Sequence, residues 1–224
     1  MSRFILVATT LAVTVAGCDR FPDNGLQIAA MLPPNDSCVF VADADLRLLA
    51  GRYDVAVPED YDYIIAPLLQ SYLITNALEF QGEQANLQVT NFQITLLLQD
   101  GTKLDLPENP YRVSTSAVIP ANQTRGAVSQ AVAAGIGIPA SYKDALAAIT
   151  PAGGSTTILL DVRAIGTTYG GFTQRSPTFT WPVELCDGCS RTIAVCTSEE
   201  AEAICLPGQD GNPYCESVVP AATP

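Results

Sequence analysis

The feature that most constrains this chain is the alternation of apolar and polar residues along short segments. In Leu87–Leu98, apolar residues occupy odd positions as far as Val89 and even positions from Phe92. A period of two places them on one face of a β-strand, and a one-residue change of phase near Asn91 is what a β-bulge produces. Asp100-Gly101 follows, a dipeptide typical of a tight hairpin turn. The segment predicts a bulged strand that enters a hairpin.

Two later segments carry the same pattern. Ile158, Leu160, Val162 and Ala164 share one face, and so do Phe179, Trp181, Val183 and Leu185. They predict two antiparallel strands of a sheet with one buried face, and Gly166–Gly171 predicts a loop between them. Pro67 inside an apolar run is typical of an edge strand or a bulge. Further strands are expected at Cys38–Val41, Arg52–Val57, Tyr63–Ile74, Lys103–Leu106 and Val113–Ile119.

One stretch has helical spacing instead. Tyr142, Leu146 and Ile149 follow Pro139, which suits a first helical turn, and predict a helix near Ala140–Thr150. A second, shorter helix is expected at Ala127–Ala134. Short strands with an inserted helical crossover favour a mainly β, Ig-like antiparallel sandwich with one or two short helices. We expect the sandwich at residues 37–185 and a disulfide-braced tail at 186–224.

The N-terminus is typical of an export signal. One positive charge at Arg3 precedes an uncharged run, Phe4–Gly17, that is too short to span a bilayer as a helix. The run ends in Val15-Ala16-Gly17-Cys18, which resembles the lipobox of bacterial lipoproteins. That resemblance implies cleavage before Cys18 and a lipid on its sulfur, so residues 1–17 would be the signal peptide. The polar, Pro-containing residues 18–36 would be a tether. The alternative is a secreted chain with Cys18 in a disulfide.

The cysteine count agrees with a lipidated Cys18. Of seven cysteines, setting Cys18 aside leaves six, an even set that an oxidising compartment would pair. Five of the six lie near the C-terminus, so one bridge must tie Cys38 to that region. The sequence does not choose among the connectivities. The six are Cys38, Cys186, Cys189, Cys196, Cys205 and Cys215.

The Cys186-Asp187-Gly188-Cys189 motif has two further interpretations. A redox-active CxxC usually opens a helix, and no helical pattern follows here. A zinc site could be assembled from Cys186, Cys189, Cys196 and Cys205. In an exported chain, structural disulfides are favoured over both, and we expect neither a metal nor another cofactor.

Composition excludes several classes of function. The net charge of −12 disfavours nucleic acid as a partner, and the absence of histidine removes His-based nucleophile and zinc systems. No serine-hydrolase, P-loop or dinucleotide motif is present, so no catalytic residue is predicted. Three acidic clusters, Asp43-Ala44-Asp45, Glu59–Asp62 and Asp210-Gly211-Asn212, could hold calcium or be solvated loops. The tyrosines could line a carbohydrate surface or fill the core; they are Tyr53, Tyr61, Tyr63 and Tyr72.

A second resemblance covers the C-terminal part of the chain. It rests on Gly166-Thr167-Thr168-Tyr169-Gly170-Gly171, Ser176, Phe179, Pro182-Val183, Cys186-Asp187-Gly188-Cys189, Cys205-Leu206-Pro207-Gly208-Gln209-Asp210-Gly211 and Cys215. With these residues the chain resembles uncharacterised lipoproteins of myxobacterial-type Gram-negative bacteria. That resemblance implies an exported lipoprotein with a β-sandwich and carries over no catalytic residue.

These observations predict a cell-envelope lipoprotein that is anchored by Cys18, in the outer rather than the inner membrane, and faces the periplasm or the surface. Its role would be structural or would lie in binding a protein or glycan. The candidate loops are polar, aromatic-bearing and flanked by strands: Pro58–Asp62, Asp105–Arg112 and Gly166–Gln174. The alternative is a small hydrolase with paired carboxylates, which would need two close carboxylates in a deep cleft.

Overall fold

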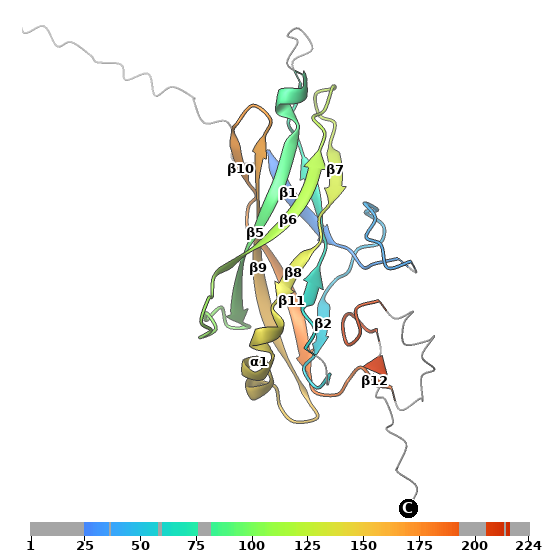
Figure 1. Cartoon of the computed structure of the whole chain (residues 1–224), viewed down its shortest axis with the longest axis vertical. Coiled ribbons are helices and arrows are strands. Elements are labelled where there is room, and N and C mark those ends of the chain that lie inside the picture. The colour runs from blue at the N-terminus through green and yellow to red at the C-terminus, as the bar shows by residue number, and fades with distance from the viewer. Residues whose placement is uncertain are drawn as a thin grey trace, which may run out of the picture.

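The chain folds mainly into β-strands, as the alternation predicts (Figure 1). The computed structural model describes residues 25–35, 37–57, 60–75, 82–192, 205–212 and 214–215. Cys18, Cys196 and the expected signal peptide at residues 1–17 lie outside these residues. Within the described residues, no helix is long and apolar enough to cross a membrane.

The largest sheet holds the strands whose alternation is clearest. Its order is β2 (Gly51–Asp54), β11 (Phe179–Cys186), β9 (Ser155–Thr168), β5 (Leu87–Leu98) and β6 (Tyr111–Ile119), and β10 (Thr173–Arg175) also pairs with β9. Neighbouring strands are antiparallel except β2 and β11, which run parallel. The predicted inward faces are correct: the side chains of Ile158, Leu160, Val162 and Ala164 are fully buried, and so are those of Val183 and Leu185.

A smaller set of strands covers that buried face. β1 (Leu26–Met31), β4 (Pro67–Ser71) and β7 (Ser129–Val132) form an antiparallel sheet, and β3 (Tyr63–Ile65) pairs with β8 (Gly135–Ile138). Leu26, Tyr63 and Leu69 from these strands join Phe92 and Leu160 in one core cluster. The two layers form the predicted Ig-like sandwich. Short elements complete it: η1 (Gly82–Ala85), β12 (Arg191–Thr192) and β13 (Tyr214–Cys215).

The bulge in β5 lies where the phase of the apolar residues changes. Val89 faces Gly166 of β9, whereas Asn91 faces Ile165, so one residue of β5 is extra. Because of that extra residue, Val89 and Phe92 both point into the core, with no exposed surface. The following turn at Gly101 has a φ of +85° and is closed by a hydrogen bond from Leu98 N to Thr102 O (2.7 Å). Beyond it, an isolated bridge joins Lys103 to Leu97 and Leu104 N donates to Leu96 O (3.0 Å), but the expected strand at Lys103–Leu106 does not form.

The predicted helix is present. It consists of η2 (Ala140–Tyr142) and α1 (Lys143–Ile149), and Tyr142 and Leu146 face the core. Thr150 ends it in extended backbone, and its hydroxyl donates to Leu146 O (2.8 Å). The expected second helix at Ala127–Ala134 is wrong. Its small side chains offer little surface for a helix to bury, and the backbone hydrogen-bonds to β4 as β7 instead.

Three further expectations are corrected. Part of the expected tether is β1, whose alternation is hidden by a register shift between Ile28 and Ala30. Cys38–Val41 is not a strand, because the Asn35 side chain accepts the backbone N–H groups of Ser37 and Val39 (both 3.0 Å). The loop expected at Gly166–Gly171 is shorter, because β9 continues to Thr168.

The segment 205–212 closes the outer edge of the large sheet. Asp54 N donates to Gly208 O and Asp210 N donates to Arg52 O (both 2.9 Å), so the segment hydrogen-bonds along β2. Gln209 is fully buried, and its side chain contacts Ile64 N (3.0 Å) and Asp62 O. An exposed strand edge would offer unpaired backbone groups to other chains, and this segment covers that edge.

Candidate functional site

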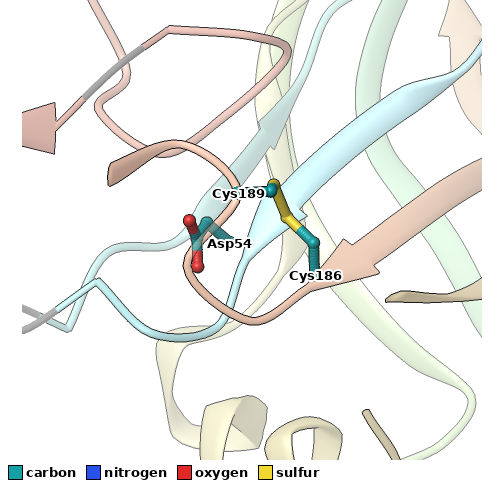
Figure 2. A group of neighbouring side chains, drawn as sticks. All are labelled: Asp54, Cys186 and Cys189. Atoms are coloured by element: carbon teal, nitrogen blue, oxygen red, sulfur yellow. A yellow bond between two sulfur atoms is a disulfide. The ribbon is translucent and has the colours of Figure 1, made fainter. Parts of the chain in front are cut away.

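A buried carboxylate lies beside the CxxC motif at the end of β11 (Figure 2). Asp54, the last residue of β2, has no exposed surface. One of its oxygens accepts the N–H groups of Ala56 and Gly188 (both 2.9 Å), and the other accepts the N–H of Ser190 (2.7 Å). Three backbone donors compensate the burial of the charge, so this carboxylate holds the turn that follows β11.

The sulfurs at this site are joined to each other. Cys186, which is buried, forms a disulfide with Cys189, which is exposed. Their sulfurs and a carboxylate oxygen of Asp54 lie within 4.8 Å of one another, a spacing that could otherwise hold a metal ion. In the disulfide state the sulfurs offer no thiolate, so the structure does not assemble the zinc set considered from the sequence. The motif also follows a strand and opens no helix, unlike the redox-active pattern.

The long-range bridge that the cysteine distribution requires is present. Cys38 pairs with Cys205, at a sequence separation of 167 residues and a Cα–Cα distance of 5.4 Å. It ties the segment between β1 and β2 to the segment that covers β2. Expected bridges through Cys196 and Cys215 involve side chains outside the described part of the chain.

Asp210 forms a second polar cluster on the same edge. Its carboxylate accepts Arg52 N (2.9 Å) and the Tyr63 hydroxyl (3.1 Å), and that hydroxyl accepts the Trp181 N–H (3.2 Å). Burial raises the pKa of Asp210 above its usual 3.8, and burial likewise raises the pKa of Tyr63. From the sequence, Asp210 belongs to an acidic cluster that could hold calcium or be a solvated loop. In the structure it fastens the C-terminal segment to the core.

Several of the tyrosines and acidic residues that were considered as binding residues instead contact other residues of the fold. Tyr53 and Tyr63 are core residues whose ring centroids are 5.8 Å apart, whereas Tyr61 and Tyr72 are partly exposed. Asp43 accepts the N–H of Asp45 (2.9 Å) in a local turn. Asp62 accepts Ala140 N (2.8 Å). The four tyrosines therefore do not form one surface.

A shallow groove of about 430 Å³ opens where η2 packs against the start of β6. The rings of Tyr111 and Tyr142 meet edge to face, 5.7 Å apart, and both are largely buried. The prolines form the apolar part of the walls, and the exposed charges of Arg112 and Glu108 flank them. The lining residues are Pro107, Glu108, Tyr111, Arg112, Val113, Pro139, Ser141 and Tyr142.

Buried polar contacts fix both walls of this groove. Asn109 accepts Leu96 N (2.9 Å) of β5 and donates to Leu96 O (2.8 Å) and to Leu104 O (2.9 Å). The Tyr111 hydroxyl of β6 donates to Gly137 O, and Lys143, which follows η2, donates to Val57 O. These hydrogen bonds fix the segments on both sides of the groove.

The three candidate binding loops lie at two ends of the molecule. Asp105–Arg112 contributes to the groove, and Asp62 of the first loop bonds to η2 beside it. Pro58 and Glu59 lie outside the described residues. Gly166–Gln174 is at the opposite end, where β9 and β10 meet (Figure 1). The sequence did not predict the helical side of the groove, because residues 139–142 indicated only that a helix begins there.

No protein-family model matches the chain, and no curated protein matches its sequence. Among solved structures, the chain is similar to the periplasmic chaperone SfaE, at 11% identity and a TM-score of 0.27. The match covers 68% of this chain and 59% of the chaperone chain, less than two thirds of its length.

Proposed function

We propose that this protein is a membrane-anchored cell-envelope lipoprotein with a binding role that needs no catalytic residue. Val15-Ala16-Gly17-Cys18 supports lipidation of Cys18, and the acyl chains would hold the protein on the outer membrane. The Cys38–Cys205 disulfide supports an oxidising compartment such as the periplasm or the cell surface.

The groove between β6 and η2 is the observation that carries the binding role. It offers an apolar wall of two prolines and two tyrosine edges, with one cation and one anion beside it. Proline-rich and extended segments dock in such grooves, where apolar side chains fill the floor and charges fix the orientation. We therefore propose an extended segment of a partner protein as the ligand.

A glycan fits the groove less well. Sugar rings stack on open aromatic faces, whereas Tyr111 and Tyr142 are each about 7% exposed. The hydrolase alternative needs a pair of close carboxylates. Among the described residues that line the groove, Glu108 is the single carboxylate.

Arg112 allows a direct test of the binding role. The Arg112→Glu protein and the unaltered protein should be compared as baits for envelope extract, and the captured protein should be quantified. We expect capture of the specific partner to fall about tenfold, because reversing a charge beside the groove replaces attraction with repulsion. The thermal transition should not move, since the Arg112 side chain is exposed.

Arg125→Glu is the matched control. Arg125 is also exposed, and it does not line the groove. Its replacement changes the net charge equally and should leave capture intact. Equal capture by all three proteins would contradict the proposal that the groove binds the partner. Turnover of a substrate that Glu108→Gln abolishes would favour the hydrolase instead.

A further inference from the structure

The described chain begins at the end of the sandwich that carries the β9–β10 hairpin (Figure 1). Gly25 is buried there: a Cβ at Gly25 would lie 2.9 Å from the side chain of Gln174 in β10 and 2.8 Å from that of Leu73. Gly25 O also accepts Tyr72 N (3.1 Å). The described chain therefore begins beside β10, seven residues after Cys18.

The hairpin tip at this end presents two aromatic side chains. Tyr169 is 54% exposed and Phe172 is 64% exposed, on either side of Gly170 and Gly171. The backbone of the tip is held firmly. Thr168 N donates to Phe172 O (2.9 Å), Tyr169 N to Asn86 O (2.9 Å) and Gly170 N to Gln84 O (2.9 Å). Two large aromatic side chains on an ordered turn thus keep more than half of their surface exposed.

The surroundings of the tip are unusual for so acidic a chain. Segments 71–75, 117–129 and 166–175 build this end, and their charged residues are Arg125 and Arg175, although the chain as a whole carries −12. The adjoining η1 adds Glu83 to them. Among the residues that the structure describes, six of the twelve exposed large hydrophobic ones belong to these three segments: Tyr72, Ile74, Val118, Val128, Tyr169 and Phe172. We call this end the apolar end. It suits contact with a surface that has negatively charged groups on the outside and an apolar interior below them.

The chain between Cys18 and Gly25 is short enough for a membrane that holds Cys18 to lie next to the apolar end. The seven residue steps from Cys18 to Gly25 span at most about 25 Å when fully extended. Phe172 is two residues beyond Gln174, so the tip projects about 7 Å past the start of the described chain. A bilayer that holds acyl chains on Cys18 lies within the reach of this short segment, on the side where the aromatic side chains are exposed.

We infer that the apolar end rests on the phospholipid surface that holds Cys18, with Tyr169 and Phe172 inserted among the headgroups. The inference rests on the proposed lipid anchor. Aromatic side chains favour the membrane interface, and arginines next to them would attract anionic headgroups. The groove beside η2 would then face away from the membrane, because η2 leads directly into α1, which lies at the other end of the sandwich (Figure 1).

The test places a fluorescent reporter at the tip. A chain beginning at Cys18 is coupled through that thiol to maleimide-phosphatidylethanolamine and bound to vesicles of phosphatidylethanolamine and phosphatidylglycerol with brominated acyl chains. Coupling makes the test independent of processing in the cell, which intact mass measures separately. The reporter is Phe172→Trp, with Tyr169→Trp as a second variant should the first fold poorly. Leu49→Trp, at an 88% exposed position away from the apolar end, is the matched control.

We expect the Phe172→Trp chain to lose about half of its added emission to bromine quenching, as a side chain at the interface would. The Leu49→Trp chain should lose none. The native Trp181 is 2% exposed and gives the same baseline in every chain. Quenching of neither reporter, or of both equally, would overturn the inference. An unlipidated Cys18 in cells would instead overturn the anchor and leave this result standing as a property of the apolar end.

Discussion

Two carboxylates show how the same residue type acquires different roles from its surroundings. Asp54 is fully buried, and three backbone N–H groups compensate its charge. Asp210 has two donors, Arg52 N and the Tyr63 hydroxyl, and its burial raises its pKa. In both cases the carboxylate joins segments that are far apart in the sequence, which composition alone cannot reveal.

Asp210 predicts a specific pH dependence. Its pKa in the folded protein lies above 3.8, so the folded state binds this proton more tightly than the unfolded state does. The stability that this group contributes is complete below 3.8 and is lost as the pH rises through the folded pKa. Asp210→Asn keeps an oxygen for both donors and has no charge to bury. The free energy of unfolding of the variant, relative to the parent, should therefore increase with pH across this window.

Urea unfolding of both proteins between about pH 3 and pH 7 measures this difference. Glu184, whose pKa is lowered by its hydrogen bond from Arg52, titrates in both proteins and cancels in the comparison. A difference that stays constant with pH would show that Asp210 is not perturbed by burial.

At the scale of elements, alternation predicted the strands with one buried face and failed elsewhere. β5, β9, β11 and the bulge near Asn91 were readable because each places its apolar residues on one face. β1 was hidden by its register shift, and β7 by small residues that suit several structures. The groove could not be predicted, because it needs β6 and η2 side by side. Of its two walls, only the one formed by Asp105–Arg112 was predicted from the sequence, as a candidate binding loop.

Gly166 is the residue on which the bulged pairing depends. It faces Val89, and a Cβ there would lie 2.7 Å from Gln88 O and 3.1 Å from Val89 Cα, both backbone atoms that cannot move alone. Gly166→Ala should lower the free energy of unfolding by about 1–3 kcal/mol, measured by urea denaturation. Gly170→Ala is the control, because its nearest neighbour would be 3.4 Å away. Equal stability of the two variants would mean that β5 and β9 are not packed this closely.

The whole molecule has two ends with different properties. The apolar end carries the first described residues and the β9–β10 hairpin, and the other end carries α1 (Figure 1), next to the η2 residues that line the groove. Along one edge between them, the segment 205–212 and its disulfide to Cys38 cover β2. This arrangement would present the groove to partners while the opposite end faces the membrane.

The two disulfides should differ in what they contribute to this assembly. Cys38–Cys205 closes a loop of 167 residues, whereas Cys186–Cys189 spans three. In the loop-entropy account, losing the first by paired Cys→Ala replacement should cost about 4–5 kcal/mol of unfolding free energy, and losing the second about 2 kcal/mol. Denaturant unfolding of the two double variants measures both. A larger loss from the Cys186 and Cys189 pair would contradict this ordering.

The central claim is that the chain is held in the envelope by a lipid on Cys18. The most direct measurement is the intact mass of the protein purified from the membrane fraction, together with the mass of its N-terminal peptide. The account predicts a chain that begins at Cys18 and carries a diacylglycerol on the sulfur and an acyl chain on the amine, and a Cys18→Ala protein that is not processed in this way. A mature chain with an unmodified Cys18, or with cleavage at another residue, would contradict it.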